Sequence, residues 1–123
     1  MQSGEFAPGE RERAEKFLRL DEDQLYSLIP TYLDEYRETS FSPSGQREAG
    51  MTWFAAVRLS LEHKVCEEWQ MCKRINDPNF QDVTNLVLVI GDAVTTVIAG
   101  VPPFLVASII VRIGVRNFCS CSS

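Results

Sequence analysis

Residues 83–113 read VTNLVLVIGDAVTTVIAGVPPFLVASIIVRI, and this stretch decides the fold. Only Asp92 and Arg112 carry a charge in it, and residues 93–111 form an uninterrupted uncharged run. So much apolar surface has to be hidden in a core, by a partner or in a lipid bilayer, because its exposure to water is unfavourable. Which of the three hides it determines most of what the protein can do.

Two helices joined at a double proline account for this stretch best. Asp82 is a suitable N-cap for the first helix, Gly100 can end it, and prolines suit the first turn of the second helix. The β-branched residues at 86–90 would also fit a buried parallel strand, but no other segment offers a convincing partner strand. We therefore expect an apolar helical hairpin that turns between Gly100 and Pro103.

The hairpin predicts an ion pair inside the protein. Asp92 and Arg112 lie ten residues on either side of Pro102. In two antiparallel helices, equal distance from the turn means similar depth, about 15 Å along each helix. An unpaired buried ion is very costly, whereas a paired one is tolerated. We predict that Asp92 and Arg112 form a buried ion pair; the alternative is that each faces water on its own helix.

The rest of the chain also predicts helices. Apolar residues recur every three or four positions from 46 to 75, which predicts one long amphipathic helix that ends before Pro78. They are Phe54, Val57, Leu61, Val65, Trp69 and Cys72. Residues 9–20 are rich in helix formers, and 25–36 have helical spacing with Pro30 in a first turn or at a kink. The sequence predicts an all-α fold, a small bundle of four to five helices.

The length and the charge distribution predict one domain with two unlike parts. A chain of 123 residues is long enough to bury a single modest core. Residues 1–45 form an acidic helical region followed by a loop, and residues 46–123 form the helical core with the hairpin. The acidic N-terminal part repels phosphate, and no basic stripe balances it, so we expect no nucleic-acid partner.

The four cysteines are interpreted from the expected compartment. Residues 1–20 lack the apolar segment of a secretory signal, so we expect a cytoplasmic location or the cytosolic face of a membrane. Free buried thiols are then the simplest interpretation. Cys119 and Cys121 follow the apolar run directly, which makes them a candidate site for reversible acylation. A metal site is a weaker alternative, because the C-x5-C and C-x-C spacings differ from metal-binding knuckles.

The sequence does not predict an enzyme. His63 and Cys66 lie three residues apart on one predicted helix and form the only candidate for thiol chemistry. No third residue is visible that would orient the imidazole, and no glycine-rich loop predicts an oxyanion hole or a phosphate site. We therefore predict no catalytic residues, no cofactor and no metal, with Cys66 and His63 as the one exception.

Two functional classes remain. The first is an interaction or adaptor module that binds a protein partner or self-associates, with a candidate surface of aromatic side chains among acidic ones. These aromatics are Tyr26, Tyr32, Tyr36 and Phe41. The second class is a small membrane-associated effector whose apolar hairpin, residues 83–115, inserts into a bilayer. Asp92 would be expensive at the centre of a bilayer, which favours the first class.

Overall fold

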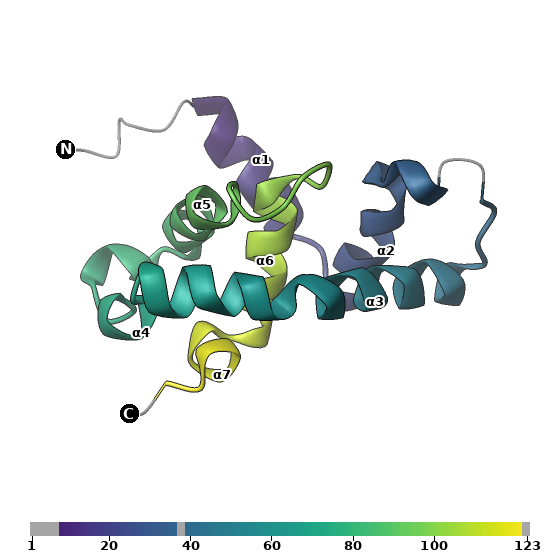
Figure 1. The fold of residues 1–123 in the computed structure, drawn as a ribbon. Helices are drawn as coiled ribbons and strands as arrows, with labels where there is room; N and C mark the ends of the chain where they lie inside the picture. Colours follow the sequence, from purple (N-terminus) through teal and green to yellow (C-terminus); the bar gives the residue numbers. More distant parts are fainter. Residues whose placement is uncertain (1–7, 37–38, 122–123) are drawn as a thin grey trace.

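The computed structural model describes residues 8–36 and 39–121 and is entirely helical (Figure 1). Helix makes up 77% of the structure, and no strand occurs among the described residues, which confirms the predicted all-α class. Residues 1–7 and 37–38 of the predicted acidic N-terminal region lie outside the described residues. The α-helices are α1 (Pro8–Leu18), α2 (Glu22–Tyr32), α3 (Pro43–Glu62), α4 (Met71–Arg74), α5 (Val83–Val94), α6 (Pro103–Ile113) and α7 (Val115–Cys119). Shorter helical turns are η2 (Asp34–Tyr36), the π-helical η3 (His63–Glu68) and η4 (Pro78–Gln81).

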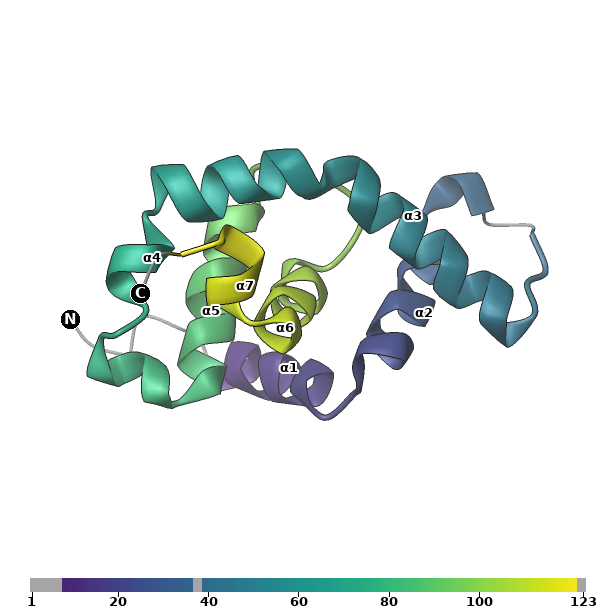
Figure 2. The ribbon, with the colours of Figure 1, turned by 90° about the horizontal axis from the view of Figure 1, so that it is seen from below.

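Helix α3 is the longest element and runs across the whole molecule (Figures 1 and 2). Ser42 caps its start, because the Gly45 amide donates to Ser42 Oγ at 3.1 Å. The turn η3 continues the helix to Glu68, where the Trp69 amide donates to the Lys64 carbonyl. Gln70 then adopts a left-handed conformation with φ of 51°, so the helix predicted over residues 46–75 ends earlier than expected.

The core centres on α6. In Figure 2 this helix is seen end-on, with α1, α2, α3 and α5 around it. All six residues from Leu105 to Ile110 are buried, and the stripe predicted for α3 buries Phe54, Leu61 and Val65 against the same core. Each fully buried leucine, isoleucine, valine or phenylalanine side chain stabilises the fold by about 1.5–3 kcal/mol relative to its exposure to water. The apolar residues of 83–113 are therefore largely hidden by packing among the protein's helices.

Helices α5 and α6 confirm the helical interpretation of residues 83–113, but they do not lie antiparallel. In Figure 1 α5 is seen nearly end-on while α6 runs along the page, and in Figure 2 the two directions are exchanged. Asp82 caps α5 as predicted, since the Thr84 amide donates to its Oδ1 at 2.9 Å. The helix ends at Val94, earlier than expected, so residues 95–102 form a long connection that allows the helices to cross.

Helices α2 and α3 pack through a direct backbone contact. Pro30 lies inside α2, near its end, rather than in the first turn of a second helix as predicted. Because proline has no N–H, the Tyr26 carbonyl receives no helical hydrogen bond from residue 30. The Gly50 backbone lies directly against that carbonyl, and a Cβ atom at position 50 would be 2.7 Å from the Tyr26 carbonyl carbon. This position therefore requires glycine.

Two disulfides fix the C-terminal end of the chain. Cys66 in η3 is bonded to Cys119, and Cys72 in α4 is bonded to Cys121. The prediction of free thiols is therefore wrong, and so is the use of Cys119 and Cys121 for acylation or for a metal, because no free cysteine is present. Gln70, between Cys66 and Cys72, and Ser120, between Cys119 and Cys121, both have left-handed backbone conformations. The chain therefore changes direction between the two cysteines on each side of the pair of disulfides.

Over the described ranges, no helix combines the length and the apolar character that crossing a bilayer requires.

Candidate interaction surfaces

The predicted aromatic surface is divided by the fold. Tyr26 belongs to the core, with 9% of its surface exposed, and its ring meets the edge of Phe54 at a centroid distance of 5.8 Å. The prediction that Tyr26 is a surface residue is therefore wrong. Burial raises the pKa of Tyr26, the charge of Glu22 adds to this effect, and Arg58 opposes it. Helical spacing alone could not distinguish this tyrosine from its exposed neighbours.

Tyr36 and Phe41 meet beside the end of α2. Their rings are 5.3 Å apart in an edge-to-face arrangement. With Pro30 and Leu33 they line a hollow of about 310 Å³. Both residues are half-buried, so their place in a partner surface stays a prediction, and Tyr32 lines a different hollow.

A second hollow, of about 400 Å³, lies where α1, α2, α5 and α6 come together. It contains Tyr32 and Asp92, which the sequence analysis selected for different reasons. Its charged lining consists of Glu10, Arg13, Lys16 and Asp92, and its remaining lining is Phe17, Tyr32, Thr95, Pro102, Pro103 and Phe104. We call it the α1–α6 cavity. No local sequence pattern indicated this cavity, because its residues come from four separate segments.

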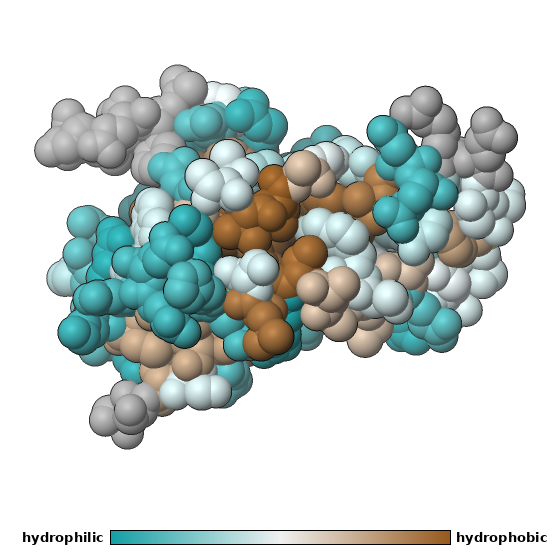
Figure 3. Space-filling model, in the orientation of Figure 1, coloured by the Kyte–Doolittle hydropathy of each residue, from teal (hydrophilic) through white to brown (hydrophobic). Residues whose placement is uncertain are grey.

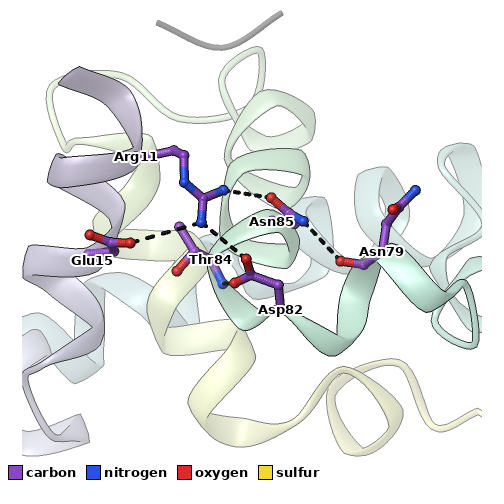
Figure 4. Close-up of polar contacts among 6 residues, drawn as sticks. All are labelled: Arg11, Glu15, Asn79, Asp82, Thr84 and Asn85. Carbon is purple, nitrogen blue, oxygen red and sulfur yellow. Dashed lines mark hydrogen bonds and ion pairs between the residues drawn. The ribbon is translucent and has the colours of Figure 1, made fainter. Parts of the chain in front are cut away.

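A polar cluster of residues outside the cavity lining fixes α1 against the start of α5 (Figure 4). Arg11 donates to Asn85 Oδ1 at 2.7 Å and to Asp82 Oδ2 at 3.1 Å, and Asn85 donates to the Asn79 carbonyl at 3.1 Å. Partial burial raises the pKa of the Asp82 carboxyl, but hydrogen bonds from the Thr84 amide and from Arg11 outweigh it. The pKa of Asp82 consequently lies below its ordinary value of 3.8.

The outward face of α3 is unusually apolar. Leu59 is 81% exposed and Met51 is 47% exposed, and Ala55 lies between them at helical spacing. Figure 3 shows apolar side chains gathered over the middle of this face of the molecule, with hydrophilic residues towards both ends. The sequence did contain a signal here, because Leu59 is a large apolar residue outside the inward stripe of α3.

The predicted buried pair of Asp92 and Arg112 is wrong, because both residues are exposed. Arg112 instead donates from Nη2 to the Leu18 carbonyl at 2.6 Å, which ties the end of α6 to the end of α1. Since α5 ends at Val94, Asp92 lies beside the connection between the helices, whereas Arg112 is nine residues into α6, about 13 Å along it. The two residues are therefore at different depths.

The candidate pair of His63 and Cys66 has no free thiol. Cys66 is part of a disulfide, and His63 lies on the exposed side of η3 between two carboxylates. His63 Nδ1 is 3.3 Å from Glu67 Oε1, and its Nε2 is 3.1 Å from Glu68 Oε2. Within the part of the chain that the structure describes, no group of three or more histidine, cysteine, aspartate or glutamate residues could hold a metal ion.

No family model, no curated protein and no solved structure matches this chain. Its function is therefore inferred from its own residues.

Proposed function

We propose that this chain is a non-enzymatic interaction module, a helical bundle built around α6 that associates through the outward face of α3. The occupant of that face is an amphipathic helix, supplied by a second copy of the chain or by a protein partner. The proposal rests on the exposure of Leu59, which is the largest for any bulky apolar side chain among the described residues. Covering such a leucine stabilises an association by about 1.5–3 kcal/mol.

The shape and charge of the face support a helical occupant. Residues 49–57 carry no charge, so a partner helix over this segment meets no ion that would have to lose its water, and next to Leu59 the charges of Arg58 and Glu62 are already paired at 2.8 Å. Ala55 and Ala56 are small and lie at the middle of the face, between Met51 and Leu59. Small central residues let two helices approach closely, and the larger flanking residues can then fill the space on either side.

A photo-crosslinking residue placed at position 59 of the full chain tests this proposal. We expect a crosslinked product, either a dimer or an adduct with one partner, from position 59 and not from position 83. Position 83 is a matched control, because Val83 is also apolar and 49% exposed but lies at the start of α5. In sedimentation, Leu59→Gln should weaken the association and Val83→Gln should not. Equal crosslinking at both positions, or none at position 59, would refute the proposal.

The two disulfides support a proposal about the compartment in which the chain matures. Disulfides persist in oxidising compartments and are rare in the cytosol. We propose that the chain matures in an oxidising compartment, in place of the cytoplasmic location that the sequence led us to expect. Trapping free thiols with iodoacetamide in the native source, followed by mass spectrometry without reduction, should find all four cysteines unmodified. Alkylation of the cysteines would contradict this location.

A further inference from the structure

The α1–α6 cavity has the size and the composition of a ligand site. Its volume of about 400 Å³ lies within the range of about 300–1,000 Å³ that is usual for small-molecule pockets. Aromatic rings and prolines supply most of its apolar lining, and charged side chains from α1 stand on one side of it. This combination of an apolar body and a few charged groups is typical of sites that orient a ligand.

The charges of the cavity favour an anion. The lining holds two carboxylates and two basic groups, and both carboxylates, Glu10 and Asp92, have an interaction partner apart from the Arg13–Glu10 approach. Lys16, in contrast, forms no ion pair with any residue that the structure describes, and Arg13 approaches a carboxylate only at 4.0 Å, from its Nη2 to Glu10 Oε2. The α1 side of the cavity therefore offers positive charge that the protein does not neutralise by close contact.

The apolar side of the cavity, around Phe104, favours a ligand with an apolar group next to its anionic group. The Arg13 guanidinium lies 5.9 Å from the centroid of the Phe104 ring, so that a positive group already occupies the vicinity of this aromatic face. A cationic ligand would be repelled there, whereas an anionic group can bind beside Arg13 and Lys16. Its apolar part can then rest against Phe104 and the adjoining prolines at 102 and 103.

We propose that the α1–α6 cavity binds a small amphipathic anion, in which a carboxylate is attached to an aromatic or branched apolar group. Arg13 and Lys16 bind the carboxylate, and Phe17, Tyr32 and Phe104 contact the apolar group. The cavity lies apart from the outward face of α3, so this site and the proposed association are independent.

Isothermal titration with N-acetylphenylalanine tests the site on the full chain with intact disulfides. N-acetylphenylalaninamide is the matched neutral probe, and phenethylamine is the cationic one. We expect N-acetylphenylalanine to bind at least about threefold more tightly than the amide, since one exposed charge contact contributes up to about a factor of five. We expect phenethylamine not to bind. Equal binding of acid and amide, tighter binding of the amine, or no binding of the acid would overturn the proposal.

Two substitutions locate the binding. Lys16→Gln should weaken the binding of N-acetylphenylalanine about threefold and reduce its preference over the amide, with Arg13 retaining the remainder. Lys73→Gln is the matched control, because Lys73 is an exposed lysine on α4, outside the cavity. Both variants should keep the thermal midpoint of the parent chain, and an equal loss of binding in the two would overturn the assignment.

The same chemistry occurs in a free metabolite and at the C-terminus of a protein that ends in an aromatic residue. The peptide Ala-Ala-Ala-Phe with a free carboxylate distinguishes these sources. Tighter binding of the peptide than of N-acetylphenylalanine assigns the site to protein C-termini, and weaker binding assigns it to free small anions. If neither probe binds, the site does not exist.

Discussion

Replacing Gly50 by alanine tests the contact that joins α2 to α3. At an exposed helical position, exchanging glycine for alanine stabilises a helix by about 1 kcal/mol. At position 50 the new Cβ atom would overlap the carbonyl oxygen of Tyr26 and lie 3.2 Å from its Cα atom. These atoms are backbone, so no side-chain rotation can remove the overlap, and the two helices have to move apart.

The expected result is a loss of stability. Overpacking of this kind costs about 1–3 kcal/mol, and a contact with backbone belongs at the upper end of this range. Separating α2 from α3 also loosens the packing of Tyr26 on Phe54. We therefore expect Gly50→Ala to lower the free energy of unfolding by about 2–3 kcal/mol, with the gain in helix propensity offsetting only part of the cost.

Two other glycines provide graded controls. A Cβ atom at Gly9 meets only the end of Arg13, at 3.7 Å, so Gly9→Ala should be neutral or slightly stabilising. At Gly91 it would lie 2.6 Å from Cδ1 of Phe104, a side chain that can turn, so its cost should fall between the other two. Urea unfolding followed by circular dichroism measures all three. Gly50→Ala as stable as Gly9→Ala would refute the reasoning.

Three further predictions concern covalent and titratable groups. Replacing Cys72 and Cys121 by serine, with the Cys66–Cys119 bond intact, should lower the free energy of unfolding in urea by about 2–3 kcal/mol. The loss is modest because, with the first bond in place, the second bond closes a loop of only about ten residues. A loss of about 4 kcal/mol or more, as expected for a loop of about fifty residues, would contradict this and show that the two bonds act independently. The carboxylate of Asp82 has a pKa below its unfolded value of 3.8, so its stabilisation is present above that pH and is lost as the pH falls through the folded-state pKa. Asp82→Asn, which can still cap α5, should therefore reduce the acid dependence of unfolding, and an unchanged pH profile would contradict this account. Tyr26 has a pKa raised above 10.0, so its stabilisation is present below pH 10 and is lost as the pH rises through the folded-state pKa. Tyr26→Phe should remove a phenol that ionises above pH 10 in an absorbance titration, and an unchanged titration above pH 10 would contradict this account.

The sequence predicted the elements better than their arrangement. Helical spacing and caps identified α3 and α5, because these signals depend on residues a few positions apart. Asp92 and Arg112 do not lie at the equal depth that the sequence had predicted, because helix α5 ends at Val94 and does not continue towards the double proline. The actual end of α5 at Val94 and the crossing of α6 depend on tertiary packing, in which both helices contact α1 and each other, and the local pattern does not contain these contacts.

The cysteines show the same limit. The expected compartment predicted free thiols, and the C-x5-C and C-x-C spacings differed from metal-binding knuckles, so neither indicated a disulfide. The break at Gln70 places Cys72 on a separate short helix, α4. Cys119 at the end of α7 then bonds to Cys66, and Cys121 just after α7 bonds to Cys72. A pairing between segments some fifty residues apart cannot be obtained from local spacing.

By itself, the sequence determined that the chain is helical and that Phe54, Leu61 and Val65 face inward, because water drives apolar side chains inward whatever the final arrangement. Only the tertiary structure decided which apolar residues stay outside, as Leu59 does, and which separate segments join to form the α1–α6 cavity. The physical reason is that helix formation and an inward apolar stripe depend on residues within one segment. An exposed apolar face or a cavity depends on how several helices pack together.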